Sequence, residues 1–212
     1  MKKLALFFTL TLILLLQACA EPEQTDVKWV KDKHYKVIND TATETPVVTE
    51  FFSFWCPHCY SYEPIVAKIK AKLDKDVSFN KVHVNFMRFT GPDVQEDATR
   101  AMLVGRALDR EDEFNQAVFS YIHEQRMPVT GLMPLKGIFL ARGVEVAEFD
   151  KIVSSFKVKT MLDQNRKDIA AFRDHLSGVP NFIINGKYQA TVTGDMTPDD
   201  IVELIVWLTT QS

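Results

Sequence analysis

The spacing of hydrophobic positions changes along the chain and predicts its elements. Residues 46–54, PVVTEFFSF, are almost continuously apolar or β-branched, which is typical of a strand covered on both faces. Residues 58–73 have a helical spacing of apolar positions, and residues 78–86 predict a second strand. A strand, a helix and a strand in this order predict a βαβ unit with parallel strands and a right-handed crossover.

Strand patterns are absent between about residues 90 and 176. Four segments in this region have the apolar spacing of helices, and they cover residues 93–108, 112–125, 146–156 and 158–176. Strand character returns in NFIINGKYQATV, residues 181–192. The Asn185–Gly186 pair within it favours a type I′ turn, so this segment predicts a β-hairpin.

A final helix is predicted after the hairpin, with Thr197 as its cap and Pro198 in its first turn. A short stretch at 35–38 predicts an edge strand. Together the elements predict an α/β protein with a thioredoxin-like fold and an inserted all-helical segment. We expect the thioredoxin-like domain to comprise residues 28–88 and 167–212, and the helical insertion to comprise residues 89–166.

The first twenty residues predict an export signal. Lys2–Lys3 precede an apolar run at 4–16, which is shorter than the ~20 residues that span a bilayer but suits a secretory signal. The motif LQAC, which ends at Cys19, resembles the lipobox of bacterial lipoproteins. It implies that residues 1–18 are removed, that Cys19 is acylated and that residues 19–27 form a tether. An ordinary signal peptide followed by a chance cysteine is the alternative.

The charge balance argues against nucleic acid as a partner. The whole chain has a net charge of −3, and without Lys2 and Lys3 it has 23 basic and 28 acidic residues, a net charge of −5. The charges are interspersed, so no basic surface is predicted. Export favours the persistence of disulfides, which makes Cys56 and Cys59 a candidate redox pair.

The segment Cys56-Pro57-His58-Cys59 lies where the predicted strand gives way to the predicted helix. Free N–H groups at a helix N-terminus favour a thiolate, and the thiolate is the species that attacks a disulfide. Because this stabilisation acts on the reduced form only, it makes the disulfide form relatively less stable and favours its transfer to a substrate. His58 adds a donor or partial positive charge beside the sulfur. The segment therefore predicts a disulfide donor.

Three other uses of the cysteine pair fit less well. A zinc site needs four ligands, and the chain has one C-x-x-C with its other histidines scattered. Haem attachment needs a histidine directly after the second cysteine, where this chain has Tyr60. A structural disulfide across so short a gap would constrain little loop entropy. We therefore expect no metal and no bound cofactor other than the redox-active disulfide Cys56–Cys59.

Three segments resemble the DsbA family of periplasmic thiol:disulfide oxidoreductases. They are EFFSFWCPHCYSYE (50–63), KVHVNFM (81–87) and GVPNFIINGKYQ (178–189). The resemblance covers nearly all of the predicted mature chain. It implies that Cys56 is the nucleophile, that Cys59 is the buried resolving thiol, and that Pro57 and His58 tune the potential. The family is an established case of a strongly oxidising couple, an extreme that comes from the resemblance and not from the spacing.

The resemblance assigns roles to two further pairs of residues. Val179–Pro180 matches the family's cis-proline loop, which binds an extended substrate backbone. Glu50 matches a buried acid that takes the proton of Cys59 through a water molecule, and Lys81 matches its partner. The residues alone leave open an ordinary loop proline, and a solvated acid and lysine at strand ends.

The resemblance also implies partners and a location. The substrates would be reduced or unfolded exported proteins, and a DsbB-type quinone-coupled membrane oxidase would restore the disulfide. We expect a monomer that faces the periplasm of a Gram-negative bacterium and is anchored to the membrane through Cys19. This anchor departs from the usual soluble pattern of the family. A reductase or isomerase on the same fold, and a redox-inactive chaperone, are the alternative functions.

Overall fold

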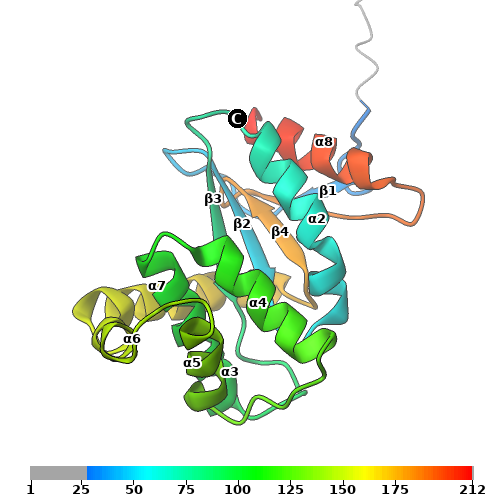
Figure 1. Ribbon diagram of the computed structural model, residues 1–212. Coiled ribbons are helices and arrows are strands. Elements are labelled where there is room, and N and C mark those ends of the chain that lie inside the picture. Colours follow the sequence, from blue (N-terminus) through cyan, green and yellow to red (C-terminus); the bar gives the residue numbers. More distant parts are fainter. Residues whose placement is uncertain (1–27, 212) are drawn as a thin grey trace, which may run out of the picture.

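The computed structural model of the protein describes residues 28–211, which form a five-stranded sheet in the order β1-β5-β4-β2-β3 (Figure 1). The strands are β1 (Tyr35–Val37), β2 (Val47–Phe52), β3 (Ser78–His83), β4 (Asn181–Ile184) and β5 (Tyr188–Ala190). β2 and β3 are parallel, and the other neighbouring pairs are antiparallel. The predicted edge strand, parallel strand pair and closing hairpin are confirmed.

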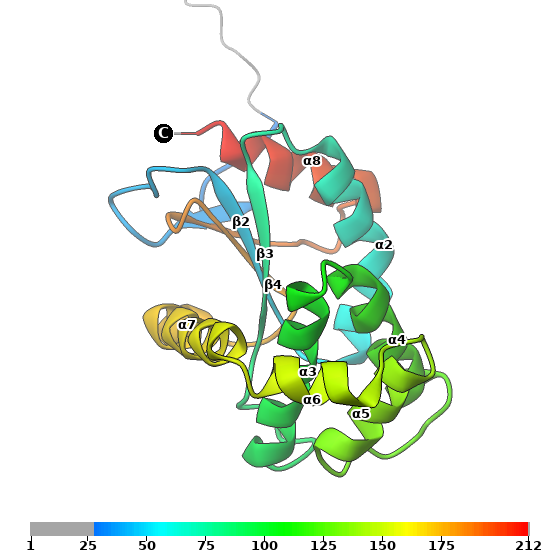
Figure 2. The same cartoon turned by 60° about the vertical axis from the view of Figure 1, so that its left-hand side comes forward.

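Helices cover both faces of the sheet and gather beyond one of its ends. They are α2 (Pro57–Lys72), α3 (Pro92–Ala107), α4 (Glu111–His123), α5 (Leu132–Leu140), α6 (Val146–Val153), α7 (Phe156–Phe172), a 3₁₀ turn (Arg173–His175) and α8 (Pro198–Thr209). α2 and α8 lie on one face and α7 on the other (Figure 2). α3 to α6 pack beyond the end at which β2 and β3 finish (Figure 1). The fold is the expected thioredoxin-like sheet with added helices.

Alternation along the central strands supplies two separate cores. Val48 and Phe182 face α2 and α8, whereas Phe51 and Ile183 face α7, and all four side chains are buried. Because successive side chains of a strand point to opposite faces, a strand buried on both sides must be almost wholly apolar. β2 meets this requirement except at Thr49 and Glu50.

Local sequence accounts for the hairpin and the last helix. Asn185 and Gly186 have φ values of 54° and 63°, the positive values that a type I′ turn needs at both central residues. Asn185 also accepts the N–H of Val47 at 3.0 Å, which ties the turn to the start of β2. Thr197 caps α8, and Asp200 completes a capping box with it. Both sequence predictions are confirmed.

The helical region contains one helix that the sequence pattern did not indicate. The four predicted helices correspond to α3, α4, α6 and α7, but α5 lies between α4 and α6. Pro134 and Gly137 lower the helix propensity of this segment. Pro134 is tolerated because it lies in the first turn, where its missing N–H would have no helical partner. Buried Leu135, Ile138 and Phe139 supply the packing that stabilises α5.

Part of the sequence prediction falls outside the described residues. The export signal, Cys19 and the tether at 19–27 belong to this part. The proposed domain boundary at residues 166 and 167 falls within α7 and stays a prediction. Within residues 28–211, no helix is long and apolar enough to cross a membrane.

Candidate redox-active site

The first cysteine caps the N-terminus of α2. Cys56 has an extended backbone, and Pro57 follows it at the first helical position. The Sγ of Cys56 accepts the backbone N–H of Cys59 at a distance of 3.3 Å. Two further contacts hold the preceding turn, because Cys56 donates its N–H to the carbonyl of Ser53 and Trp55 donates its N–H to the Ser53 hydroxyl. The sulfur therefore occupies the place that a capping oxygen takes in other helices.

The two thiols differ in accessibility and acidity. Both are free, and the residue exposures are 4% for Cys56 and 0% for Cys59. A hydrogen bond with the Cys59 thiol, backbone N–H groups of Cys59 and His58, and the charge of His58 lower the pKa of Cys56 to about 6, against the effect of burial. Burial raises the pKa of Cys59 far above that of a free thiol, and the hydrogen bond to Cys56 adds to this effect. Cys56 is therefore the thiol that ionises readily, and Cys59 is the thiol that stays protonated.

The loop before β4 faces this pair across the end of the sheet. The peptide bond between Val179 and Pro180 is cis. The thiol of Cys56 donates to the carbonyl of Val179 at 3.3 Å, so the expected loop does lie against the first cysteine. A groove of about 270 Å³ extends from this point, and Val179, Pro180, His58 and Tyr62 are among the residues that line it.

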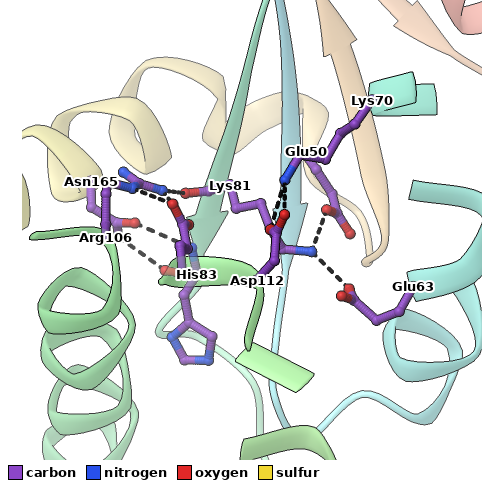
Figure 3. A network of polar contacts seen from close by, with 9 residues as sticks. Glu50, Glu63, Lys70, Lys81, His83, Arg106, Asp112 and Asn165 are labelled. Atoms are coloured by element: carbon purple, nitrogen blue, oxygen red, sulfur yellow. Dashed lines mark hydrogen bonds and ion pairs between the residues drawn. The ribbon is translucent and has the colours of Figure 1, made fainter. Parts of the chain in front are cut away.

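An ion cluster lies behind the cysteines, between β2, β3 and α2. Glu50 and Lys81 are direct neighbours in the parallel register, and Lys81 Nζ lies 2.7 Å from Glu50 Oε2. The same Nζ donates to Glu63 Oε1 at 2.7 Å, so Lys81 lies between two carboxylates (Figure 3). Glu50 and Lys81 have exposures of 0% and 3%, which rules out the solvated pair.

This cluster is electrostatically coupled to the second cysteine. Burial raises the pKa of the Glu50 carboxyl, and the charge of Glu50 contributes to the raised pKa of Cys59. Burial alone would lower the pKa of Lys81, but the carboxylates of Glu50 and Glu63 reverse this and raise it. Lys81 therefore stays protonated, and Glu50 keeps a free acceptor, since its Oε1 makes no hydrogen bond with the described residues.

Comparison with known proteins places this geometry in a family. Residues 47–206 match the family described as the DSBA-like thioredoxin domain. The chain is 35% identical over 165 residues to the thiol:disulfide interchange protein DsbA of Escherichia coli K12, with 76% of each chain covered. The chain belongs to the DsbA family. This membership confirms that the protein is a thiol:disulfide oxidoreductase with a thioredoxin-like fold.

Solved structures of the family share the fold. DsbA of Proteus mirabilis superposes with a TM-score of 0.75 at 24% identity, covering 86% of this chain and 98% of that chain. A cysteine-to-serine form of the Proteus protein, solved with the non-covalently bound peptide PWATCDS, has a TM-score of 0.73 at 24% identity, with 86% and 99% covered.

Two residues of the site in this DsbA-family chain were not predicted from the sequence. Glu63 is the third member of the ion cluster, and it lies one helical turn after Cys59, a spacing that would have placed it on the same side of α2. His123, at the end of α4, contacts the backbone just before Cys56. No local pattern indicates this contact, because it depends on how the helical region packs against α2.

The remaining histidines of the neighbourhood have different environments. His58 is exposed beside the sulfur of Cys56. His83 is completely buried, its Nδ1 lies 2.9 Å from the Thr99 hydroxyl, and burial lowers its pKa to about 3. His83 is therefore a neutral core residue. No group of three or more residues suited to holding a metal ion occurs in the described part of the chain.

Proposed function

We propose that the protein donates its Cys56–Cys59 disulfide to newly exported proteins in the periplasm. The observation that carries this proposal is the arrangement of the two thiols. Cys56 contacts Val179, a residue that lines the groove, and its sulfur accepts a helix-terminal N–H, whereas Cys59 is fully buried and has a raised pKa. Such an arrangement stabilises the reduced form relative to the disulfide, which is what a donor requires.

The proposed reaction moves two electrons from the substrate to the enzyme, while one proton ends on Cys59 and the other is released to solvent. A substrate thiolate attacks Sγ of Cys56, the Cys56–Cys59 bond breaks, and Cys59 leaves as a thiolate. A second substrate thiolate then attacks the substrate sulfur of the mixed disulfide. The substrate disulfide forms and Cys56 leaves as a thiolate, which its lowered pKa favours.

Glu50 and Lys81 are proposed to assist proton transfer to and from the Cys59 sulfur. The departing Cys59 thiolate lies in a fully buried position and must be protonated there. Glu50 is buried, coupled to Cys59 and equipped with a free oxygen, which supports a role as a proton carrier through a water molecule. Lys81 holds the carboxyl in place and balances its charge. Pro57 and His58 are proposed to set the potential.

The groove beside Val179 and Pro180 is proposed to bind the substrate backbone. The Proteus mirabilis relative was solved with a bound peptide that contains a cysteine, which supports peptide binding by this fold. We further propose that the protein is a monomer, that Cys19 anchors it to a membrane, that it faces the periplasm, and that a DsbB-type quinone-coupled membrane oxidase restores its disulfide. Cleavage at an ordinary signal site would instead leave Cys19 unacylated.

Two cysteine variants test the proposal with reduced, unfolded ribonuclease as the substrate. Cys56→Ser is expected to abolish disulfide formation and to form no mixed disulfide. Cys59→Ser has no disulfide to donate, so it is offered scrambled, disulfide-bonded ribonuclease instead. Its Cys56 thiolate is expected to attack a ribonuclease disulfide, release one ribonuclease thiolate and stay trapped in the mixed disulfide, because the resolving thiol is absent. A chaperone would suppress aggregation equally well in both variants and form no covalent adduct. A glutathione equilibrium in the range of a strongly reducing thioredoxin would overturn the oxidase and indicate a reductase.

A further inference from the structure

The end of α4 is attached to the backbone just before the redox pair. His123 is the last residue of α4, and its Nε2 lies 2.8 Å from the carbonyl oxygen of Phe54. A carbonyl oxygen only accepts hydrogen bonds, so this nitrogen carries the proton and donates it. Phe54 is buried and precedes Cys56 by two residues. His123 is the only donor to this carbonyl among the contacts of the described residues.

The imidazole ring of His123 is also held by the residue that follows the redox pair. The ring stacks on Tyr60, with an interplanar angle of 4° and centroids 5.2 Å apart. The Tyr60 hydroxyl donates to Glu124, which also accepts the hydroxyl of Ser120. The end of α4 thus contacts the chain on both sides of the cysteines, at Phe54 and at Tyr60. Figure 1 shows this end of α4 beside the beginning of α2.

The segment from Ser53 to Cys56 determines where the sulfur lies relative to α2. Its internal hydrogen bonds involve Ser53, and the Phe54 carbonyl depends on His123. A buried carbonyl without a hydrogen-bond partner is destabilising, and the segment can relieve this cost by moving towards solvent. Such a movement would disturb the contact between Cys56 Sγ and the Cys59 N–H, because hydrogen bonds weaken steeply as their geometry changes.

We infer that His123 is a positioning residue for disulfide exchange, which holds the Phe54–Cys56 segment where the Cys56 thiolate is stabilised. This inference rests on the proposed function of the cysteine pair. It assigns the helical region a part in the chemistry, since α4 supplies the donor and the thioredoxin-like part supplies both cysteines.

Two substitutions separate the donor from the ring. His123→Phe keeps an aromatic ring for stacking on Tyr60 and removes the N–H donor. His123→Gln removes the ring and keeps an N–H donor of similar reach. Tyr60→Phe is the matched control, because it keeps the stack and removes a different hydrogen bond, the one to Glu124.

The readouts are the thiolate titration of Cys56 and the equilibrium with glutathione. For His123→Phe we expect a raised Cys56 pKa and an equilibrium constant for oxidising glutathione that falls roughly tenfold, or about 30 mV. For His123→Gln and Tyr60→Phe we expect the acid dissociation constant of Cys56 and the equilibrium constant with glutathione to stay within about threefold of the parent values. Such a difference is smaller than the net contribution of one hydrogen bond. Parent-like values in His123→Gln would show that the N–H donor of His123 is what matters. A role in packing alone would instead be preserved by the ring of His123→Phe.

The inference fails if folded His123→Phe has the parent titration and potential, or if glutamine does not rescue them. Should His123→Phe not fold, the parent protein still decides the question. Nitrogen NMR must find Nε2 of His123 protonated in the reduced form, and an unprotonated Nε2 overturns the inference. Failure of the proposed function is a separate result, because the parent chain itself would then show no exchange with glutathione, or an equilibrium in the range of a strongly reducing thioredoxin.

Discussion

The thiol of Cys56 donates to the carbonyl of Val179 at 3.3 Å, although the two residues are 123 positions apart in the sequence. The same sulfur accepts the N–H of Cys59. When Cys56 loses its proton, the first contact loses its donor, whereas the second becomes charge-assisted and stronger. Ionisation therefore moves the sulfur's interactions towards α2 and leaves the Val179 carbonyl free to accept a hydrogen bond from another group.

The first prediction concerns the ionisation of Cys56. The thiolate absorbance of the reduced protein should titrate with a midpoint near the pKa of about 6 that the hydrogen bonds of Cys59 and the charge of His58 produce. The absorbance of Cys56→Ser, measured in parallel, is subtracted to remove the contribution of other titrating groups. A midpoint near the free-thiol value of about 8.5 would contradict the assignment of Cys56 as the nucleophile.

The second prediction concerns the stability of the reduced form. The pKa of Cys56 is about 6 in the folded protein and about 8.5 in an unfolded chain, so it is depressed by folding. A depressed thiol pKa contributes stability that is complete above the unfolded value and is lost as the pH falls through the folded value. Urea unfolding should therefore show a stability gain on the order of 2 kcal/mol between pH 6 and 8.5, after allowance for solvent screening.

The oxidised protein provides the control for this pH dependence. Its cysteines do not titrate, so its free energy of unfolding should lack the rise seen in the reduced form. An identical pH profile for the two forms would show that the stabilisation does not come from Cys56.

The third prediction is that His58→Leu makes the couple more reducing. His58 lowers the pKa of Cys56 through its charge and its backbone N–H, and leucine keeps only the latter. The equilibrium constant for oxidising glutathione should fall, and each tenfold decrease corresponds to a reduction potential that is lower by about 30 mV. His175→Leu, in the 3₁₀ turn after α7, is a histidine control that should leave the potential unchanged, because His175 is not among the groups that shift the pKa of Cys56. Equal potentials for the His58 variant and the parent would remove His58 from the tuning role.

The fourth prediction concerns the buried ion cluster. Lys81→Met should destabilise the reduced protein by about 3–5 kcal/mol, because it leaves Glu50 buried beside Glu63 with no cation between them. Adding Glu50→Gln to the same chain should recover most of the loss. The exposed pair Lys68–Asp199 supplies the control, and Lys68→Met should cost less than about 1 kcal/mol. Similar losses for Lys81→Met and Lys68→Met would show that the cluster is not electrostatically important.

Local chemistry fixed those parts of the protein that the sequence alone determined. The apolar run of β2 needs burial on both faces, Asn185 and Gly186 accept the positive φ values of a tight turn, and Thr197 caps a helix wherever that helix packs. The site at Cys56 follows from the same logic, because its chemistry depends on a strand ending where a helix begins. The predictions for these elements needed no knowledge of distant contacts.

Only the tertiary structure decided which distant groups complete the site. α5 forms despite Pro134 and Gly137, since packing outweighs weak local propensity. Glu50 and Lys81 could equally have been solvated, and the parallel register of β2 and β3 is what buries them together. The tertiary structure brings Glu63 to Lys81 in the ion cluster. It also brings His123 to the Phe54 carbonyl and the Val179 carbonyl to Cys56. Hydrogen bonds and charges act over a few ångströms of space, and separation along the chain does not predict that distance.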